Sequence, residues 1–267
     1  MGIATLNPSY YNCNAMTGPI RPLAVLMAAL LCWTGTASAQ ELRRATVWDL
    51  KPGQPVAAQP ARDEFRGFAC GSNGGPPRQR LTGWSDFARC PAEPGGLREV
   101  YFEYDDELEY IARAKDLERE VTRWAGTTEL AFPVIVSALF DSGGVLKGIR
   151  VVTDPRPEHR IETTDSDLRK RDDSYLFGGR MAARFDIDAQ RDCTALPPAE
   201  GESPVGSLFI KQSCELVDPA HRRGISLKVN YFRKPGQSAF NPQMPTQLTE
   251  GQFESSARLE VMDTGGN

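Results

Sequence analysis

Residues 132–152 constrain the fold of this chain more than any other stretch of its sequence. Two runs rich in β-branched residues, 132–140 and 145–152, flank Asp141-Ser142-Gly143-Gly144, which is typical of a hairpin turn. The first run is apolar on both faces, as expected of a strand that is covered on both sides. The sequence therefore predicts an antiparallel hairpin whose first strand lies at the centre of a sheet.

A strand and a helix are predicted directly before this hairpin. Residues 97–104 alternate apolar and polar side chains, which favours a strand. Asp105 follows as a helix N-cap, and apolar residues three and four positions apart predict a helix from about 106 to 124. The acids at 105–107 lack the alternating ligands of a calcium loop, so they are interpreted as complementing the helix dipole. Residues 97–153 thus predict a β-α-β-β unit with the helix packed across the sheet.

The last third of the chain carries further strand patterns. Apolar and polar residues alternate in 208–216, 225–231 and 257–261, which predicts strands of a half-exposed antiparallel β region. Gln212 and Cys214 lie on the apolar face of the first of these runs. The predicted fold class is therefore α+β, with one main helix packed on the β-α-β-β unit and a further antiparallel β region after it.

These patterns divide the chain into five predicted parts, with one continuous domain over 63–263 as the alternative. Within the last part, residues 174–189 have mixed periodicity and allow either a short helix or a strand. The five parts are a signal peptide at 1–39, an extended segment at 40–62, a disulfide-closed loop with the β-α-β-β unit at 63–155, a charged linker at 156–175 and an antiparallel β region at 176–263.

The first 39 residues have the order of a signal peptide. A polar segment that ends at Arg21 precedes the apolar run 22–33, and small residues follow as far as Ala39. The apolar run is well short of the roughly 20 residues that cross a bilayer. We therefore expect cleavage after Ala39, with an uncleaved membrane anchor as the alternative. The rest of the sequence holds no long apolar run, so no membrane insertion of the mature chain is expected.

Composition bears on the compartment and on the partners. Arg, Gly, Pro and Ala are abundant while Lys is scarce, which indicates a GC-rich bacterial genome and, together with the leader, the periplasm. The net charge is −4, and the sequence lacks the basic excess that polyanion binding requires. Nucleic acid is therefore not expected as a partner.

Four cysteines remain after the predicted cleavage, an even number that indicates two disulfides in an oxidising compartment. Three pairings are possible, and loop-closure entropy favours the local one, Cys70 with Cys90 and Cys193 with Cys214. Each bridge would stabilise the fold by about 3 kcal/mol in the chain-entropy model. Redox and metal roles are the alternative, but the sequence has no Cys-x-x-Cys and no histidine at ligand spacing.

No catalytic, cofactor-binding or metal-binding residue is assigned from motifs. The sequence has neither the Gly-x-Ser-x-Gly of serine hydrolases nor the His-Glu-x-x-His of metalloproteases. His159, in a charged run, and His221, in a turn, are interpreted as surface residues. A paired-carboxylate mechanism leaves no sequence signature, so it stays open.

Three functions are consistent with these observations. The first is a non-enzymatic periplasmic module that binds a protein or an envelope component, with Phe68, Trp84, Phe87 and Phe240 as possible aromatic anchors. The second is a small-ligand binder with a pocket between helix and sheet, and the third is a carboxylate-dependent hydrolase. The first is preferred because no catalytic motif is found, although aromatic residues in turns often pack within their own loops.

Export can be checked on protein recovered from the periplasm of an expressing bacterium. We expect an N-terminus at Gln40, because cleavage is predicted after Ala39. Mass spectrometry should also show two hydrogens fewer per disulfide than in the reduced chain. An intact leader, or free thiols at all four remaining cysteines, would contradict the prediction.

Overall fold

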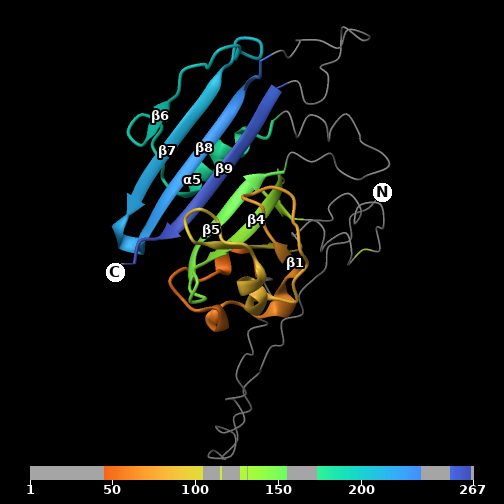
Figure 1. Ribbon diagram of the computed structural model, residues 1–267. Helices are drawn as coiled ribbons and strands as arrows, with labels where there is room; N and C mark the ends of the chain where they lie inside the picture. Colours follow the sequence, from red (N-terminus) through yellow and green to blue (C-terminus); the bar gives the residue numbers. More distant parts are fainter. Residues whose placement is uncertain are drawn as a thin grey trace, which may run out of the picture. The chain divides into compact units, whose positions relative to one another are not determined.

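The computed structural model describes residues 45–104, 115, 127–130, 132–154, 173–235 and 253–265 (Figure 1). Several predictions fall on other residues and lie outside the described ranges. They concern the leader at 1–39, all but one residue of the helix at about 106–124, most of the charged segment at 156–175, and Phe240.

Nine strands in the described ranges form an antiparallel sheet. Eight of them follow the order β1-β2-β4-β5-β9-β8-β7-β6, and β3 pairs with β4 off this path. In Figure 1 the long strands β7, β8 and β9 lie side by side. The strands are Arg66–Cys70 (β1), Arg98–Glu103 (β2), Thr128–Glu129 (β3), Phe132–Phe140 (β4), Leu146–Thr153 (β5), Cys193–Ala195 (β6), Ile210–Asp218 (β7), Arg223–Arg233 (β8) and Phe253–Asp263 (β9).

The fold class is mainly β, so the predicted α+β class is wrong. The described residues contain one α-helix, α5 (Leu176–Arg184), beside short 3-10 helices. The prediction placed a further antiparallel β region after the β-α-β-β unit without stating how the two pair, and in the structure β9 pairs with both β5 and β8. Strands from both regions therefore share one sheet. Alternation shows which face of a strand is buried, whereas it does not show which strand lies beside it.

The hairpin at 132–152 has the predicted form. β4 pairs with β5 in antiparallel register, and Asp141 Oδ1 accepts hydrogen bonds from the backbone N–H groups of Gly143 and Val145, both at 2.9 Å. Gly144 has a φ of +79°, in the left-handed region that favours glycine. Residues 134–140 of β4 are all buried, which agrees with the prediction of a central strand covered on both faces.

Two disulfides close the local loops that the sequence predicts. Cys70, at the end of β1, is bonded to Cys90, which follows the 3-10 helix η4 (Trp84–Arg89). Cys193 of β6 is bonded to Cys214 of β7, and these two residues are direct partners in the antiparallel ladder. The second bridge therefore fastens the short strand β6 to the rest of the sheet.

Helix α5 packs against β8 and β9. Phe177 and Met181, which are four residues apart and so share one face of the helix, are fully buried. Gly178 lies so close to β8 that a Cβ at this position would be 2.4 Å from Val229 Cγ2. The lack of a side chain at residue 178 thus sets how closely the helix approaches the sheet.

The two adjacent glycines of α5 provide a test of this packing. Gly178→Ala should destabilise the fold by about 1–3 kcal/mol, because the added methyl group overpacks the contact with Val229. Gly179→Ala is the matched control: a Cβ there has nothing within 4 Å, so the better helix propensity of Ala should stabilise the fold by about 0.5–1 kcal/mol. Urea unfolding measures both effects, and shifts of the same sign would contradict the close approach of α5 to β8.

Candidate functional site

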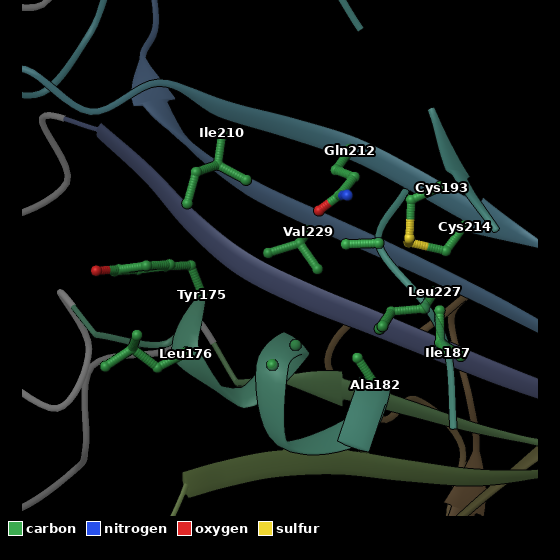
Figure 2. A pocket seen from close by; sticks show the side chains of 13 residues that line it. Tyr175, Leu176, Ala182, Ile187, Cys193, Ile210, Gln212, Cys214, Leu227 and Val229 are labelled. Atoms are coloured by element: carbon green, nitrogen blue, oxygen red, sulfur yellow. A yellow bond between two sulfur atoms is a disulfide. The ribbon is translucent and has the colours of Figure 1, made fainter. Parts of the chain in front are cut away.

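An apolar pocket lies between α5 and the strands β7 and β8 (Figure 2). Its volume is about 270 Å³, slightly below the roughly 300–1,000 Å³ that is usual for ligand pockets. The lining residues are Cys193, Ile210, Gln212, Cys214, Leu227 and Val229 from the sheet, Tyr175, Leu176, Gly178, Gly179 and Ala182 from the helix and its start, and Ile187 and Ala189 from the segment that follows.

The pocket arises because branched side chains on the sheet face small residues on the helix. Leu227 and Val229 occupy alternate positions of β8, so both lie on the same face of the sheet. The helix presents Gly178, Gly179 and Ala182 to the pocket, and a Cβ on Gly179 would have nothing within 4 Å. The helix therefore touches the sheet at Gly178, while the missing side chain at Gly179 leaves space unfilled.

Fixed groups bound the pocket on two sides. The ring of Tyr175 stacks on that of Tyr231 with 4.3 Å between centroids, and the backbone N–H of Tyr175 donates to Ser255 Oγ at 3.2 Å. The Cys193–Cys214 disulfide lies on the far side of the pocket from Tyr175 in Figure 2. Walls that are held in this way need little ordering when a ligand binds.

Gln212 is the polar residue that the strands contribute to the pocket wall. It lies on β7 between Ile210 and Cys214, which line the pocket with it. None of the lining residues that the structure describes carries a charge. The pocket is therefore suited to an uncharged, mainly apolar molecule, and its described lining holds no acid–base pair.

The aromatic residues predicted as binding anchors pack inside the protein wherever the structure describes them. Phe68 and Trp84 are 6% and 5% exposed, and their ring centroids lie 4.7 Å apart in an edge-to-face contact. Phe87 is partly buried and its ring packs against that of Phe140 at 5.5 Å, while Phe240 lies outside the described residues. A turn-rich sequence predicts exposed backbone, but it does not predict which way the rings point.

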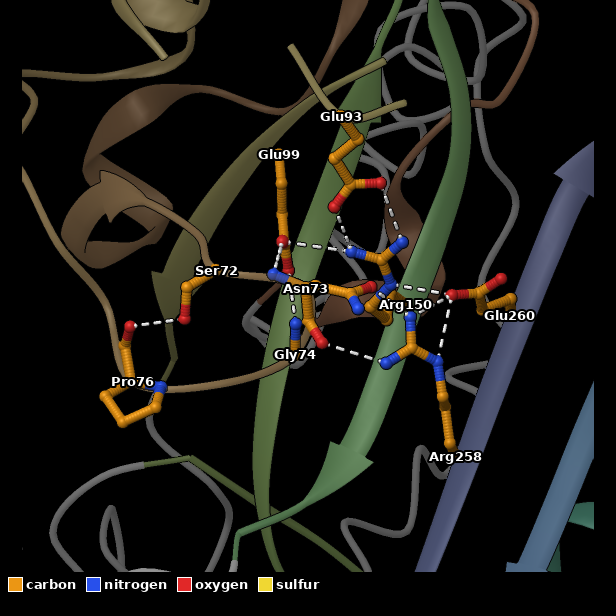
Figure 3. A network of polar contacts seen from close by, with 9 residues as sticks. All are labelled: Ser72, Asn73, Gly74, Pro76, Glu93, Glu99, Arg150, Arg258 and Glu260. Atoms are coloured by element: carbon orange, nitrogen blue, oxygen red, sulfur yellow. Dashed lines mark hydrogen bonds and ion pairs between the residues drawn. The ribbon is translucent and has the colours of Figure 1, made fainter. Parts of the chain in front are cut away.

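A second candidate site is a cluster of charges around Arg150 of β5 (Figure 3). The Arg150 side chain is 5% exposed and donates to Glu93 through both terminal nitrogens, at 2.7 and 3.0 Å. Its Nε donates to Glu260 at 2.7 Å, and its Nη1 lies 3.0 Å from Glu99 Oε2. The buried guanidinium thus has three carboxylate partners, which offset the cost of removing it from water.

The same cluster fastens the glycine-rich loop at 71–77 to the sheet (Figure 3). Glu99 of β2, with a side chain that is 3% exposed, accepts hydrogen bonds from the backbone N–H groups of Asn73 and Gly74. Arg258 of β9 donates to the backbone oxygen of Asn73 at 2.9 Å and to its Oδ1 at 2.6 Å. These contacts tie the loop to β2 and β9, and Glu99 in turn lies against Arg150 of β5.

The pKa values of the carboxyl groups decide whether this cluster is suited to acid–base chemistry. The hydrogen bond from Arg150 lowers the pKa of Glu93. Burial is the largest single influence on Glu260 and raises its pKa, but the hydrogen bonds and positive charges of Arg150 and Arg258 together outweigh burial, so this pKa is lowered as well. A carboxylate hydrolase needs one acid with a raised pKa. Glu93 and Glu260 stay ionised at neutral pH instead, and we interpret the cluster as a structural ion network.

The histidines do not add a catalytic group to either site. His221 lies at the turn between β7 and β8, with Nδ1 2.7 Å from Asp218 Oδ2, which also accepts from Arg223. His159 lies outside the described residues. In the part of the chain that the structure describes, no group of three or more His, Cys, Asp or Glu residues is arranged to hold a metal ion.

The ion network yields a prediction about stability and pH. Arg150→Met should destabilise the fold by about 3–5 kcal/mol at pH 7, because it leaves buried carboxylates without their counter-charge. The lowered pKa values of Glu93 and Glu260 stabilise the unaltered protein above the ordinary glutamate pKa of 4.5, and this contribution is lost as the pH falls below it. Urea unfolding from pH 7 to pH 3 should therefore show the difference between the two proteins shrinking. A difference that is constant with pH would contradict the prediction.

No protein-family model, no curated protein and no solved structure that was compared with this chain matches it. Neither a ligand nor an activity is therefore carried over from a relative. The pocket and the ion network are the features on which a functional proposal has to rest.

Proposed function

We propose that this protein is exported to the periplasm and binds a small, mainly apolar molecule in the pocket between α5 and the strands β7 and β8. The pocket itself carries the proposal, because apolar side chains and a few polar groups line a cavity of about 270 Å³. This composition is typical of small-ligand sites. Burial of the ligand's apolar surface would drive binding, at roughly 25 cal/mol per Å².

A binding role is favoured over catalysis and over docking through aromatic anchors. Phe68 and Trp84 lie in the core, so they support the docking of a protein partner less well than exposed rings would. Arg150 lowers the pKa of both Glu93 and Glu260, so neither of these two carboxylates is suited to be the acid of a hydrolase. An envelope component with an apolar chain remains a suitable ligand for the pocket.

Two features support export. Residues 1–39 have the order of a signal peptide, and the arginine-rich composition favours a bacterial periplasm. The four cysteines outside this leader form two disulfides, which persist in oxidising compartments. Among the helices in the described ranges, none combines the length and the hydropathy that crossing a membrane requires.

A fluorescence titration with N-phenyl-1-naphthylamine, an uncharged apolar dye, tests the pocket. Ala182→Leu should weaken dye binding by about tenfold, which corresponds to about 1.4 kcal/mol, because the larger side chain fills the pocket from α5. Ala183→Leu is the matched control. Ala183 is exposed and does not line the pocket, so this variant should bind the dye as the unaltered protein does.

Circular dichroism and urea unfolding establish that both leucine variants are folded before the titrations are compared. Two outcomes would overturn the proposal. One is that the folded, unaltered protein does not bind the dye, and the other is that Ala182→Leu and Ala183→Leu bind it equally well.

A further inference from the structure

We infer that the ligand is uncharged and carries one neutral hydrogen-bonding group that binds the side chain of Gln212. The inference rests on the proposed function, because it names the class of molecule that the same pocket takes. It starts from Gln212, the polar residue that the strands contribute to a mainly apolar wall (Figure 2).

The position of Gln212 directs its side chain to the pocket. Its Cα partners are Val229 on β8 and Ala195 on β6, and Ile210 and Cys214 flank it on the pocket side of β7. Figure 2 shows the carboxamide of Gln212 turned toward the space between the sheet and α5. The sheet thus places one carboxamide, which can both donate and accept hydrogen bonds, beside the space that a ligand would fill.

The carboxamide of Gln212 has no hydrogen-bond partner among the residues that the structure describes. The side chain is only partly buried, so solvent can hydrogen-bond to it, and a bound ligand would displace that solvent. A purely apolar ligand would leave the amide unpaired in apolar surroundings, which is unfavourable. A ligand that binds well therefore brings a group that donates to the amide oxygen or accepts from the amide nitrogen.

The remaining lining selects against a charged ligand. The described residues around the pocket provide no opposite charge, and most of them are aliphatic. A carboxylate or an ammonium group would leave water without gaining a counter-charge, which is strongly unfavourable. The matching class is a short apolar chain or ring that ends in an alcohol, a ketone or a primary amide.

Competition against N-phenyl-1-naphthylamine at about pH 7.5 tests this class with octanamide, octanoate and octylamine, since the last two are charged at that pH. Octanamide should displace the dye at concentrations about tenfold lower than either charged ligand. Gln212→Leu should weaken octanamide binding about tenfold and leave dye binding within about twofold. Gln212→Glu should reverse the preference in favour of octylamine, because it supplies the missing counter-charge.

Gln190→Leu is the control, because it makes the same change at an exposed glutamine that does not line the pocket. It should alter neither dye nor octanamide binding. The inference would be overturned if octanamide and octanoate displaced the dye equally well, or if Gln212→Leu left octanamide binding unchanged. In either case the proposed function would still be supported, because the protein binds the dye. A folded protein that binds no dye at all would overturn the proposed function, and this inference with it.

Discussion

The pairing of β5 with β9 is the contact on which the rest of the sheet depends. It joins residues 148–152 to 258–262, and without it β1–β5 and β6–β9 would be two separate sheets, each with an additional open edge. Arg150 and Glu260, 110 positions apart in the chain, are direct partners in this ladder and are also hydrogen-bonded through their side chains. The guanidinium of Arg150 also binds Glu93 and lies against Glu99, which holds the loop at 71–77. The register that pairs β5 with β9 therefore also helps to position this loop.

How much of this fold is predictable from sequence depends on the range of each contact. The hairpin at 132–152 and the two disulfides are local, and their turn residues and cysteine spacings carry enough information to identify them. The β5–β9 pairing is not local. A period of two residues identifies the buried face of each strand but leaves its neighbour undetermined, so it does not predict that β5 pairs with β9. The α+β prediction is wrong because the described residues form mainly strands and contain one α-helix. The helix at about 106–124 stays a prediction.

The candidate site, too, is predictable from the sequence only in part. Gln212 is visible in the sequence as a polar residue on the apolar face of 208–216, and a pocket between a helix and a sheet is among the expected functions. The helix that completes the pocket is not predicted uniquely, because Gly178 and Gly179 weaken the helical signal of 174–189. These same glycines allow α5 to approach the sheet and leave space beside it. The residues that form the site are thus the residues that obscure it in the sequence.

The Cys193–Cys214 disulfide, which lines the pocket, also affects the edge of the sheet at strand β6. Strand β6 has three residues and is the last strand of the sheet, next to β7. It is held there by the Cys193–Cys214 bond as well as by its ladder of hydrogen bonds. An edge strand offers unpaired backbone groups to other chains, and a short edge offers few of them. Loss of the bond would weaken the cover over β7, a strand of nine residues that borders an apolar cavity. The Cys193–Cys214 bond therefore helps to keep the three-residue strand β6, rather than the nine-residue strand β7, at this edge of the sheet.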